Sequence, residues 1–581
     1  PAIEIIEKMG ITNQNDPQVE TATKTIYKKE FHAGITTEIT GKYAGTPVRD
    51  IKDVLINDFI EENIATVLYE SSEKVVCRCG TTCHVKMFKD QWFLKFGDVE
   101  WKEKVRNHVE QMLFLPPEGK ASFDYTIDWL HDKACTRRSG LGTPLPWDPT
   151  WIVETLSDST IYMAYYTLAK YVTSGDLTVE QATVEFFNYI FRGIGDANSI
   201  SQQINMPKDK LDEMRAEFCY WYPMDIRISG KDLIHNHLTF CLFHHAALFD
   251  TDLQPRGMGV NGHMSVEGQK MSKSKGVLTP LNEATQIFGA DLTRIGLLGA
   301  GENLSDAKFA ETDVRSYARW LESLYRYSKE KPVSQEMNFI DHWLLSRLQT
   351  HISVAEGHAE NLRTRSYLQT VLFDLINDLR WYRRRSFEIG PAFPEAVETA
   401  IRLLTPITPH FSEEIWETSE KTGFIATAPY PEADVGKKAP LIETQDLFLR
   451  SVMDDIDKIR QALKKDQFSR IDIIIPSQWM YTVRDMAEES KDDLIKRIMQ
   501  VNEIKSQGKR AISYAQKILK SPTEFSILTR ENEENALTSA KDFLSQHYST
   551  EINVLFAENS DSSKAQIAEP GRPGINFILV E

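Results

Sequence analysis

Residues 224–249 read MDIRISGKDLIHNHLTFCLFHHAALF, and this stretch decides the predicted fold. Its first seven residues are typical of a strand that ends in glycine, and the rest is typical of a long apolar helix. A strand, a tight turn and a helix in this order form the nucleotide-binding unit of doubly wound sheets. We therefore predict an α/β fold for the middle of the chain.

The chain has 581 residues, too many for one hydrophobic core, and its segments differ in pattern. Mixed helical and extended segments at the start are typical of connecting structure. Strong 3.6-residue periodicity after the α/β region predicts a helical bundle. The last part combines helices with strands such as RIDIIIP and predicts a small α+β domain. The predicted domains are 1–90, 91–335 with a helical insertion at about 172–217, 336–440 and 441–581.

The composition is typical of a soluble cytoplasmic protein. Hydrophobic residues make up 41% of the chain, but no run of about 18 apolar residues could span a bilayer. The net charge of -17 argues against a uniformly basic surface, so any contact with RNA must be local. The six cysteines do not follow the pattern of a secreted disulfide framework, which favours a reducing compartment.

Two groups of residues have spacings that are compatible with zinc. Cys77, Cys79 and Cys83 lie close together in the sequence, next to His84. His237, Cys241 and His244 would share one helical face, where packing of satisfied core side chains explains them more simply. We assign no metal ligand from these patterns.

Residues 270–276, KMSKSKG, have the chemistry of a phosphate clamp. Nearby loop glycines allow the backbone to approach a polyphosphate, and two lysines with two hydroxyl groups can neutralise charge as pyrophosphate leaves ATP. A generic loop with two lysines is usually only a solvated surface. This string, however, matches the KMSKS signature of the class I aminoacyl-tRNA synthetases.

The resemblance to this family implies roles for individual residues. Lys273 would be the principal lysine that stabilises the transition state of amino-acid adenylation, with Lys270 as its helper. Met271, Ser272 and Ser274 would belong to the same ATP-binding loop, with ATP and Mg²⁺ as the substrate pair.

Gly230, Asp232 and His237 resemble the element of class I enzymes that holds the adenosine half of ATP. Glycine ends the strand closely, a carboxylate can accept hydrogen bonds from both ribose hydroxyl groups, and a histidine one turn along the helix would point the same way. By itself this pattern is weak, because an isolated Asp more often caps a helix. Its position some forty residues before the lysine loop favours the binding role.

Four other segments narrow the resemblance to leucyl-tRNA synthetases of the archaeal and eukaryotic cytosolic type. Residues 75–96 are similar to the point where the chain returns from the editing insertion to the catalytic domain. Residues 135–146 partly match the SRQRYWGTPIP turn of the leucine, isoleucine and valine group. Residues 154–164 and 220–238 resemble the leucyl enzymes more than the others. The resemblance implies a leucine-tRNA ligase, which activates leucine with ATP and transfers it to tRNA-Leu.

A tRNA-binding surface is predicted at Arg383, Arg384 and Arg385, beside Trp381 and Tyr382. Guanidinium groups can pair with phosphates, and aromatic rings can stack on bases. Three consecutive arginines are often only a solvated helix face, but this segment resembles the anticodon-type bundle that follows the lysine loop. By the same resemblance, residues from about 445 onwards would contact the long variable arm of tRNA-Leu.

The other half of the expected active site is missing from the sequence. No HIGH-type histidine motif is present, and PAIEIIEKMGI at the start resembles the end of the editing insertion. We therefore expect a fragment or subunit that works with a separate N-terminal half. A tRNA-binding fragment without catalysis, and a synthetase for isoleucine, valine or methionine, remain as alternatives.

Overall fold

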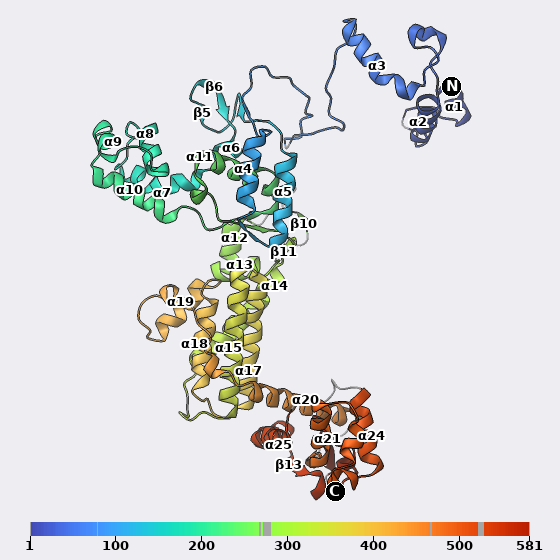
Figure 1. The fold of residues 1–581 in the computed structure, drawn as a ribbon, viewed down its shortest axis with the longest axis vertical. Coiled ribbons are helices and arrows are strands. Elements are labelled where there is room, and N and C mark those ends of the chain that lie inside the picture. Colours follow the sequence, from blue (N-terminus) through green and yellow to red (C-terminus); the bar gives the residue numbers. More distant parts are fainter. Residues whose placement is uncertain are drawn as a thin grey trace. The chain divides into compact units, whose positions relative to one another are not determined.

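The computed structural model describes residues 2–14, 16–77, 79–266, 269–270, 280–464, 468–520 and 528–579. The chain forms two compact units, Pro1–Gln91 and Trp92–Glu581, both drawn in Figure 1. No helix in the described part of the chain is long and apolar enough to cross a membrane.

The described residues of the first unit form three α-helices with few buried side chains. These helices are α1 (Ala2–Lys8), α2 (Val19–Tyr27) and α3 (Val48–Glu61). Between Ile64 and Gln91 the described chain has almost no regular secondary structure, apart from one antiparallel bridge from Val76 to Thr82. Among the described residues of this unit, only Ala22 and Ile51 are buried. Hydrophobic burial within the unit is therefore slight.

The second unit begins with the predicted α/β region. Strands β2 (Leu113–Leu115), β8 (Gly257–Asn261) and β7 (Arg227–Gly230) form a sheet in that order, and both pairings are parallel. After β7 come a 3₁₀ turn, a π-helical turn (Ile234–Leu238) and α11 (Thr239–Leu248). Helices α4 (Val99–Val109) and α5 (Lys120–Trp129) pack with this helix around a core rich in phenylalanine. The predicted strand, helix and α/β class are confirmed.

Smaller elements surround this sheet. A helical insertion with its own core consists of α7 (Tyr162–Ser174), α8 (Val184–Phe187), α9 (Ala197–Gln203) and α10 (Lys208–Trp221). The short strands form three further sheets. In the first, β1 (Phe93–Leu94) pairs with β3 (Lys133–Ala134), and in the second, β6 (Asp148–Val153) lies between β4 (Thr136–Arg137) and β5 (Pro144–Leu145). In the third, β9 (Met264–Val266) lies between β10 (Gln269–Lys270) and β11 (Ala307–Phe309). The short helix α6 (Thr155–Asp158) connects β6 to the insertion.

The helical bundle follows as predicted from the periodicity. A capping box starts its long helix α15. The Asn338 side chain accepts a hydrogen bond from the Asp341 backbone amide, and the Asp341 carboxylate accepts one from the Asn338 backbone amide. The helices of this region are α12 (Leu281–Phe288), α13 (Ala290–Leu298), α14 (Glu311–Ser328), α15 (Phe339–Glu360), α16 (Thr364–Leu368), α17 (Leu375–Arg385), α18 (Ala392–Leu404), α19 (Pro409–Thr418) and α20 (Pro440–Leu463).

The C-terminal part combines helices and strands, as predicted. Strand β12 (Phe468–Ile475), which contains the RIDIIIP sequence, lies between β13 (Glu551–Phe556), which is parallel to it, and β14 (Gly574–Leu579), which is antiparallel. Its helices are α21 (Gln478–Glu489), α22 (Leu494–Ile498), α23 (Asn502–Lys505), α24 (Lys509–Lys520), α25 (Arg530–Ser539) and α26 (Lys541–Tyr548). One core cluster runs from the bundle into this sheet, so the two parts share buried apolar surface.

A buried ionic network holds helix α17 of the bundle to α20, the last helix of this region. Arg385 Nη1 lies 2.5 Å from Asp446 Oδ1, and their side chains are only 4% and 1% exposed. Trp381 Nε1 donates to the same oxygen at 3.1 Å, and Arg450 Nε donates to Asp446 Oδ2 at 2.7 Å. The carboxylate is therefore the common acceptor for three donors from two helices.

Asp446→Asn should destabilise the second unit, because it leaves the Arg385 charge buried without a counter-ion. Removing one partner of a buried pair costs about 3–5 kcal/mol. The urea midpoint of unfolding, followed by tryptophan fluorescence, should fall markedly. Asp455→Asn is the control on the same helix, since Asp455 pairs with Lys458 on the surface and such pairs contribute about 0–1 kcal/mol. Equal midpoints for the two variants would contradict this role of Asp446.

Candidate nucleotide site

The carboxyl ends of β7 and β8 lie next to each other in the sheet. In this parallel pair Gly230 is the partner of Asn261, so both strands end at the same edge of the sheet. Ligands of open α/β sheets bind outside this edge. The residues that follow β7 include Asp232, and those that follow β8 lead into the lysine loop.

Gly230 and Asp232 form a tight turn at the end of β7. A Cβ atom on Gly230 would lie 2.6 Å from Asp232 Oδ1, so a side chain at this position would displace the carboxylate. Asp232 itself is exposed. Lys231 Nζ lies 2.7 Å from Asp306 Oδ1 and donates to the Leu304 carbonyl at 2.9 Å, which attaches the turn to the segment before β11. The contacts of Lys231 therefore fix the end of β7, where the Asp232 carboxylate is exposed.

His237 is buried behind this turn. Arg227 Nη2 donates to His237 Nδ1 at 3.2 Å, which leaves the proton on Nε2, 3.0 Å from Ser159 Oγ. Burial and the Arg227 charge lower the pKa of His237, so its ring is neutral near pH 7. The expectation that it faces outward together with Asp232 is not met, because its ring is turned towards Ser159 and Arg227. The contact does join two segments that the sequence singled out, 154–164 and 220–238.

The residues with zinc-like spacing have other partners in the structure. His244 Nδ1 hydrogen-bonds with the Thr160 hydroxyl group, and burial lowers the pKa of His244 to about 4. Cys241 is buried, with its sulfur 3.4 Å from His245 Nδ1. Within the described residues, no group of three or more His, Cys, Asp or Glu is arranged to hold a metal ion, and this includes Cys77, Cys79 and Cys83.

The segment that leads from β8 to the lysine loop begins with a close backbone contact. Gly262 is buried, and its amide group donates to the Asn303 carbonyl at 3.1 Å. A Cβ atom there would lie 2.0 Å from the Ser305 carbonyl oxygen, so only glycine fits. Lys270 ends β10, with its backbone paired to Ser265. Met271, Ser272, Lys273 and Ser274 lie outside the described residues.

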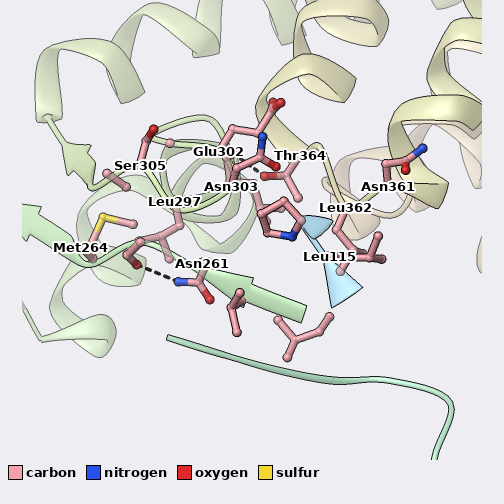
Figure 2. Close-up of a pocket in the computed structure, with 17 residues that line it drawn as sticks. Leu115, Asn261, Met264, Leu297, Glu302, Asn303, Ser305, Asn361, Leu362 and Thr364 are labelled. Atoms are coloured by element: carbon pink, nitrogen blue, oxygen red, sulfur yellow. Dashed lines mark hydrogen bonds between the residues drawn. The ribbon is translucent and has the colours of Figure 1, made fainter. Parts of the chain in front are cut away.

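A cavity of about 340 Å³ lies beside the start of this loop, as shown in Figure 2. Leu115, Val260 and Leu297 give it apolar walls, while Asn261 and Asn303 supply amide groups at its edge. Asn261 Nδ2 donates to the Gly262 carbonyl at 2.9 Å. These residues follow no sequence motif and meet only through the fold, so no sequence pattern predicts them.

Comparisons with known proteins place the chain in a family. Residues 63–319 match the model for class I tRNA synthetases (M), and residues 341–475 match the model for the anticodon-binding domain of tRNA ligases. The leucine-tRNA ligase of Methanosarcina acetivorans is 40% identical over 99% of this chain and 62% of its own length. The chain belongs to the class I tRNA synthetases.

A second curated relative of this class I synthetase chain is also a leucine-tRNA ligase. The leucine-tRNA ligase of Methanocaldococcus jannaschii is also 40% identical, over 99% of this chain and 61% of its own length. The chain therefore spans about three fifths of the curated relatives that it matches, and the predicted resemblance to leucyl enzymes is confirmed. A solved methionyl-tRNA synthetase of Mycobacterium tuberculosis, in complex with methionyl-adenylate, overlaps 61% of this chain and 67% of its own, at 15% identity and a TM-score of 0.43. A score this low does not establish a common fold.

The three predicted tRNA-binding arginines have different environments in this synthetase chain. Arg385 is buried against Asp446, which favours a structural role. Arg383 is partly exposed, with Nε 2.9 Å from Glu330 Oε2. Arg384 is exposed, and its Nη2 lies 2.9 Å from His547 Nε2. Only Arg384 presents most of its side chain to solvent.

A second basic surface lies on the C-terminal part of the synthetase chain and was missed in the sequence analysis. Residues 491–520 contain eight Lys or Arg and three Asp or Glu. Lys496, Lys505 and Lys509 are exposed, and none of them forms an ion pair with another residue that the structure describes. The excess of basic residues in this stretch was a signal that could have revealed the surface.

Gly262→Ala should disrupt the start of the lysine loop, because the new methyl group meets a backbone carbonyl that cannot rotate away. Overpacking of this kind costs about 1–3 kcal/mol. We expect a lower midpoint of thermal unfolding and faster proteolysis near the loop. Gly357→Ala is the control, since nothing lies within 4 Å of a Cβ at this exposed position of helix α15. It should leave stability unchanged or raise it by up to about 1 kcal/mol. A harmless Gly262→Ala would refute the close contact.

Proposed function

We propose that the chain supplies the lysine-loop half of a leucine-tRNA ligase, which activates leucine with ATP and transfers it to tRNA-Leu in the cytoplasm. The observation that carries this proposal is the 40% identity to leucine-tRNA ligases across 99% of the chain. The class I model named for methionine enzymes matches only residues 63–319, so it argues less strongly for methionine. We assign the parts as 1–90 connective tail, 91–335 catalytic half, 336–440 anticodon-type bundle and 441–581 tRNA-binding domain.

In this proposal the edge formed by β7 and β8 binds ATP. The exposed Asp232 carboxylate accepts hydrogen bonds from the ribose, and Gly230 allows the close approach. The neutral His237 ring forms the wall behind this turn. Lys270 and Lys273 place positive charge where pyrophosphate leaves, and Met271, Ser272 and Ser274 shape the same loop. Mg²⁺ would enter with ATP as part of the substrate.

The open edge of the sheet supports the need for a second half with the HIGH-type motif. Strand β7 is an edge strand among the described residues, and its Ile228 is 57% exposed. Nearby helix α5 exposes Tyr125 at 63% and Trp129 at 56%. Parallel sheets are normally covered on both faces and contain more than three strands. We infer that further strands from an N-terminal half pair with this edge and complete the adenylation site.

Two surfaces are proposed to bind tRNA. Arg384 is the remaining candidate on the bundle, because Arg383 is paired and Arg385 is buried. On the C-terminal part, Lys496, Lys505 and Lys509 are exposed and form no ion pair with another described residue. A fragment that binds tRNA without catalysis is the second candidate function, since these surfaces do not depend on the adenylation site.

Leucine-dependent exchange of pyrophosphate into ATP should require both halves. We expect no exchange with this chain alone and clear exchange after an N-terminal half with the histidine motif is added. In that mixture Lys273→Ala should slow exchange by about 100-fold or more, because transition-state charge loses its partner. Lys308→Ala is the control, as Lys308 is an exposed lysine on β11. If the mixture shows no pyrophosphate exchange but this chain still binds tRNA, the chain would be a tRNA-binding fragment without catalysis.

Replacing Lys505 and Lys509 with Ala should weaken tRNA binding and reduce its salt dependence. Each lost phosphate contact lowers the slope of log K against log salt by about 0.7–0.9, so we expect a decrease of about 1.5. Lys421 and Lys437 provide a matched pair of substitutions, because Glu398 and Glu395 already neutralise them. Filter binding at several salt concentrations measures both slopes. Identical slopes for the two double variants would exclude this surface.

A further inference from the structure

Three exposed cysteines lie on one small hairpin in the first unit. The Cys77 amide donates to the Thr81 carbonyl at 2.8 Å, and the Cys83 amide donates to the Val75 carbonyl at 2.8 Å. Gly80 makes the turn with a φ of +86°, in the left-handed region that favours glycine. All three thiols are free and exposed. The adenylation chemistry proposed above does not use them.

The sulfur atoms of Cys77 and Cys79 are unusually close. Their separation of 3.1 Å is shorter than the distance of about 3.8 Å between two thiolates on one tetrahedral zinc ion with bonds of about 2.3 Å. Residues two apart span at most about 7 Å, so their Cα atoms can reach the range of about 4.4–6.8 Å that disulfides adopt. The distance between the two sulfur atoms is therefore more compatible with formation of a disulfide than with two ligands of one metal ion.

We propose that Cys77 and Cys79 form a reversible thiol pair that hydrogen peroxide oxidises to a disulfide. The Cys79 thiolate attacks one peroxide oxygen; the O–O bond breaks and the S–O bond of a sulfenic acid forms, while the released hydroxide takes up a proton to give water. The Cys77 sulfur then attacks Cys79; the S–S bond forms, the S–O bond breaks, and hydroxide leaves with the Cys77 proton as a second water. Two thiols lose two electrons and one peroxide gains them.

Cys79 is the thiol that reacts first. The Thr81 hydroxyl group at 3.3 Å and the Cys77 thiol at 3.1 Å stabilise its thiolate, which lowers the pKa of Cys79 to about 7. Near pH 7 a large share of Cys79 is therefore the reactive thiolate. Exposure on the hairpin allows peroxide and a reductant to reach it.

Cys83 stands apart from this pair. Its sulfur lies 4.0 Å from the Thr81 carbonyl oxygen, on the segment that follows the turn. The geometry thus selects Cys77 as the resolving thiol and leaves Cys83 reduced.

The test is peroxide treatment of the whole chain at pH 7, followed by alkylation and peptide mass spectrometry. We expect loss of two thiols, an internal Cys77–Cys79 link that is 2 Da lighter than the dithiol, and full recovery with dithiothreitol. Cys219 is the internal control, because it is an exposed free cysteine on helix α10. Its oxidation should be about fivefold slower, since the Thr81 hydroxyl group and the Cys77 thiol stabilise the thiolate of Cys79.

Single substitutions separate the roles of the three cysteines. Cys83→Ser should keep the Cys77–Cys79 link, and Cys77→Ser should instead accumulate a Cys79 sulfenic acid that dimedone traps. Links through Cys83, or a Cys79 that reacts no faster than Cys219, would overturn the proposal. So would one tightly bound zinc ion per chain that is lost in Cys77→Ser, Cys79→Ser and Cys83→Ser alike. The outcome does not depend on ligase activity, so failure of the proposed function would leave this test unaffected.

Discussion

The parallel pairing of β7 with β8 is the constraint on which the candidate site depends. Because Gly230 is the register partner of Asn261, the turn that carries Asp232 and the start of the lysine loop emerge at one edge of the sheet. A shift of the register by one residue would turn the side chains of β7 to the other face. Gly230 and Asn261 are thirty-one residues apart in the sequence, so this pairing is what makes the two strand ends neighbours.

The buried Asp446 network performs a similar task for the bundle and the C-terminal part. Desolvating a carboxylate is unfavourable, and here three donors from Arg385, Arg450 and Trp381 compensate for it. Buried ion pairs of this kind are weak evidence for stability but strong constraints on geometry, because removal of one partner leaves a buried charge. The shared core cluster around the network indicates that α17 and α20 keep a fixed relation. A surface for tRNA that extends over both parts would then need little reordering on binding.

Features that depend on local sequence were predicted, whereas features that depend on contacts between distant residues were not. The strand and helix of 224–249 follow from residue order alone, and the lysine loop was recognised because its string is specific. The π-helical turn at Ile234–Leu238 has no simple signature, so the inward direction of His237 towards Ser159 and Arg227 could not be anticipated. In the same way, Arg385 has the sequence context of an exposed helix face, and only Asp446, sixty-one residues later, explains its burial. Clusters such as Asn261 and Asn303 arise from folding and follow no spacing rule.

The acidic composition of the chain does not conflict with the proposal that it binds tRNA. The net charge is -17, yet residues 491–520 alone have five more basic than acidic side chains. At physiological ionic strength charges are screened beyond about 8 Å, so distant carboxylates have little effect on a phosphate near Lys505 or Lys509. What matters most is whether a lysine forms a direct ion pair with a carboxylate, as Lys421 and Lys437 do. Local pairing, rather than total charge, therefore decides which faces of an acidic protein can receive a polyanion.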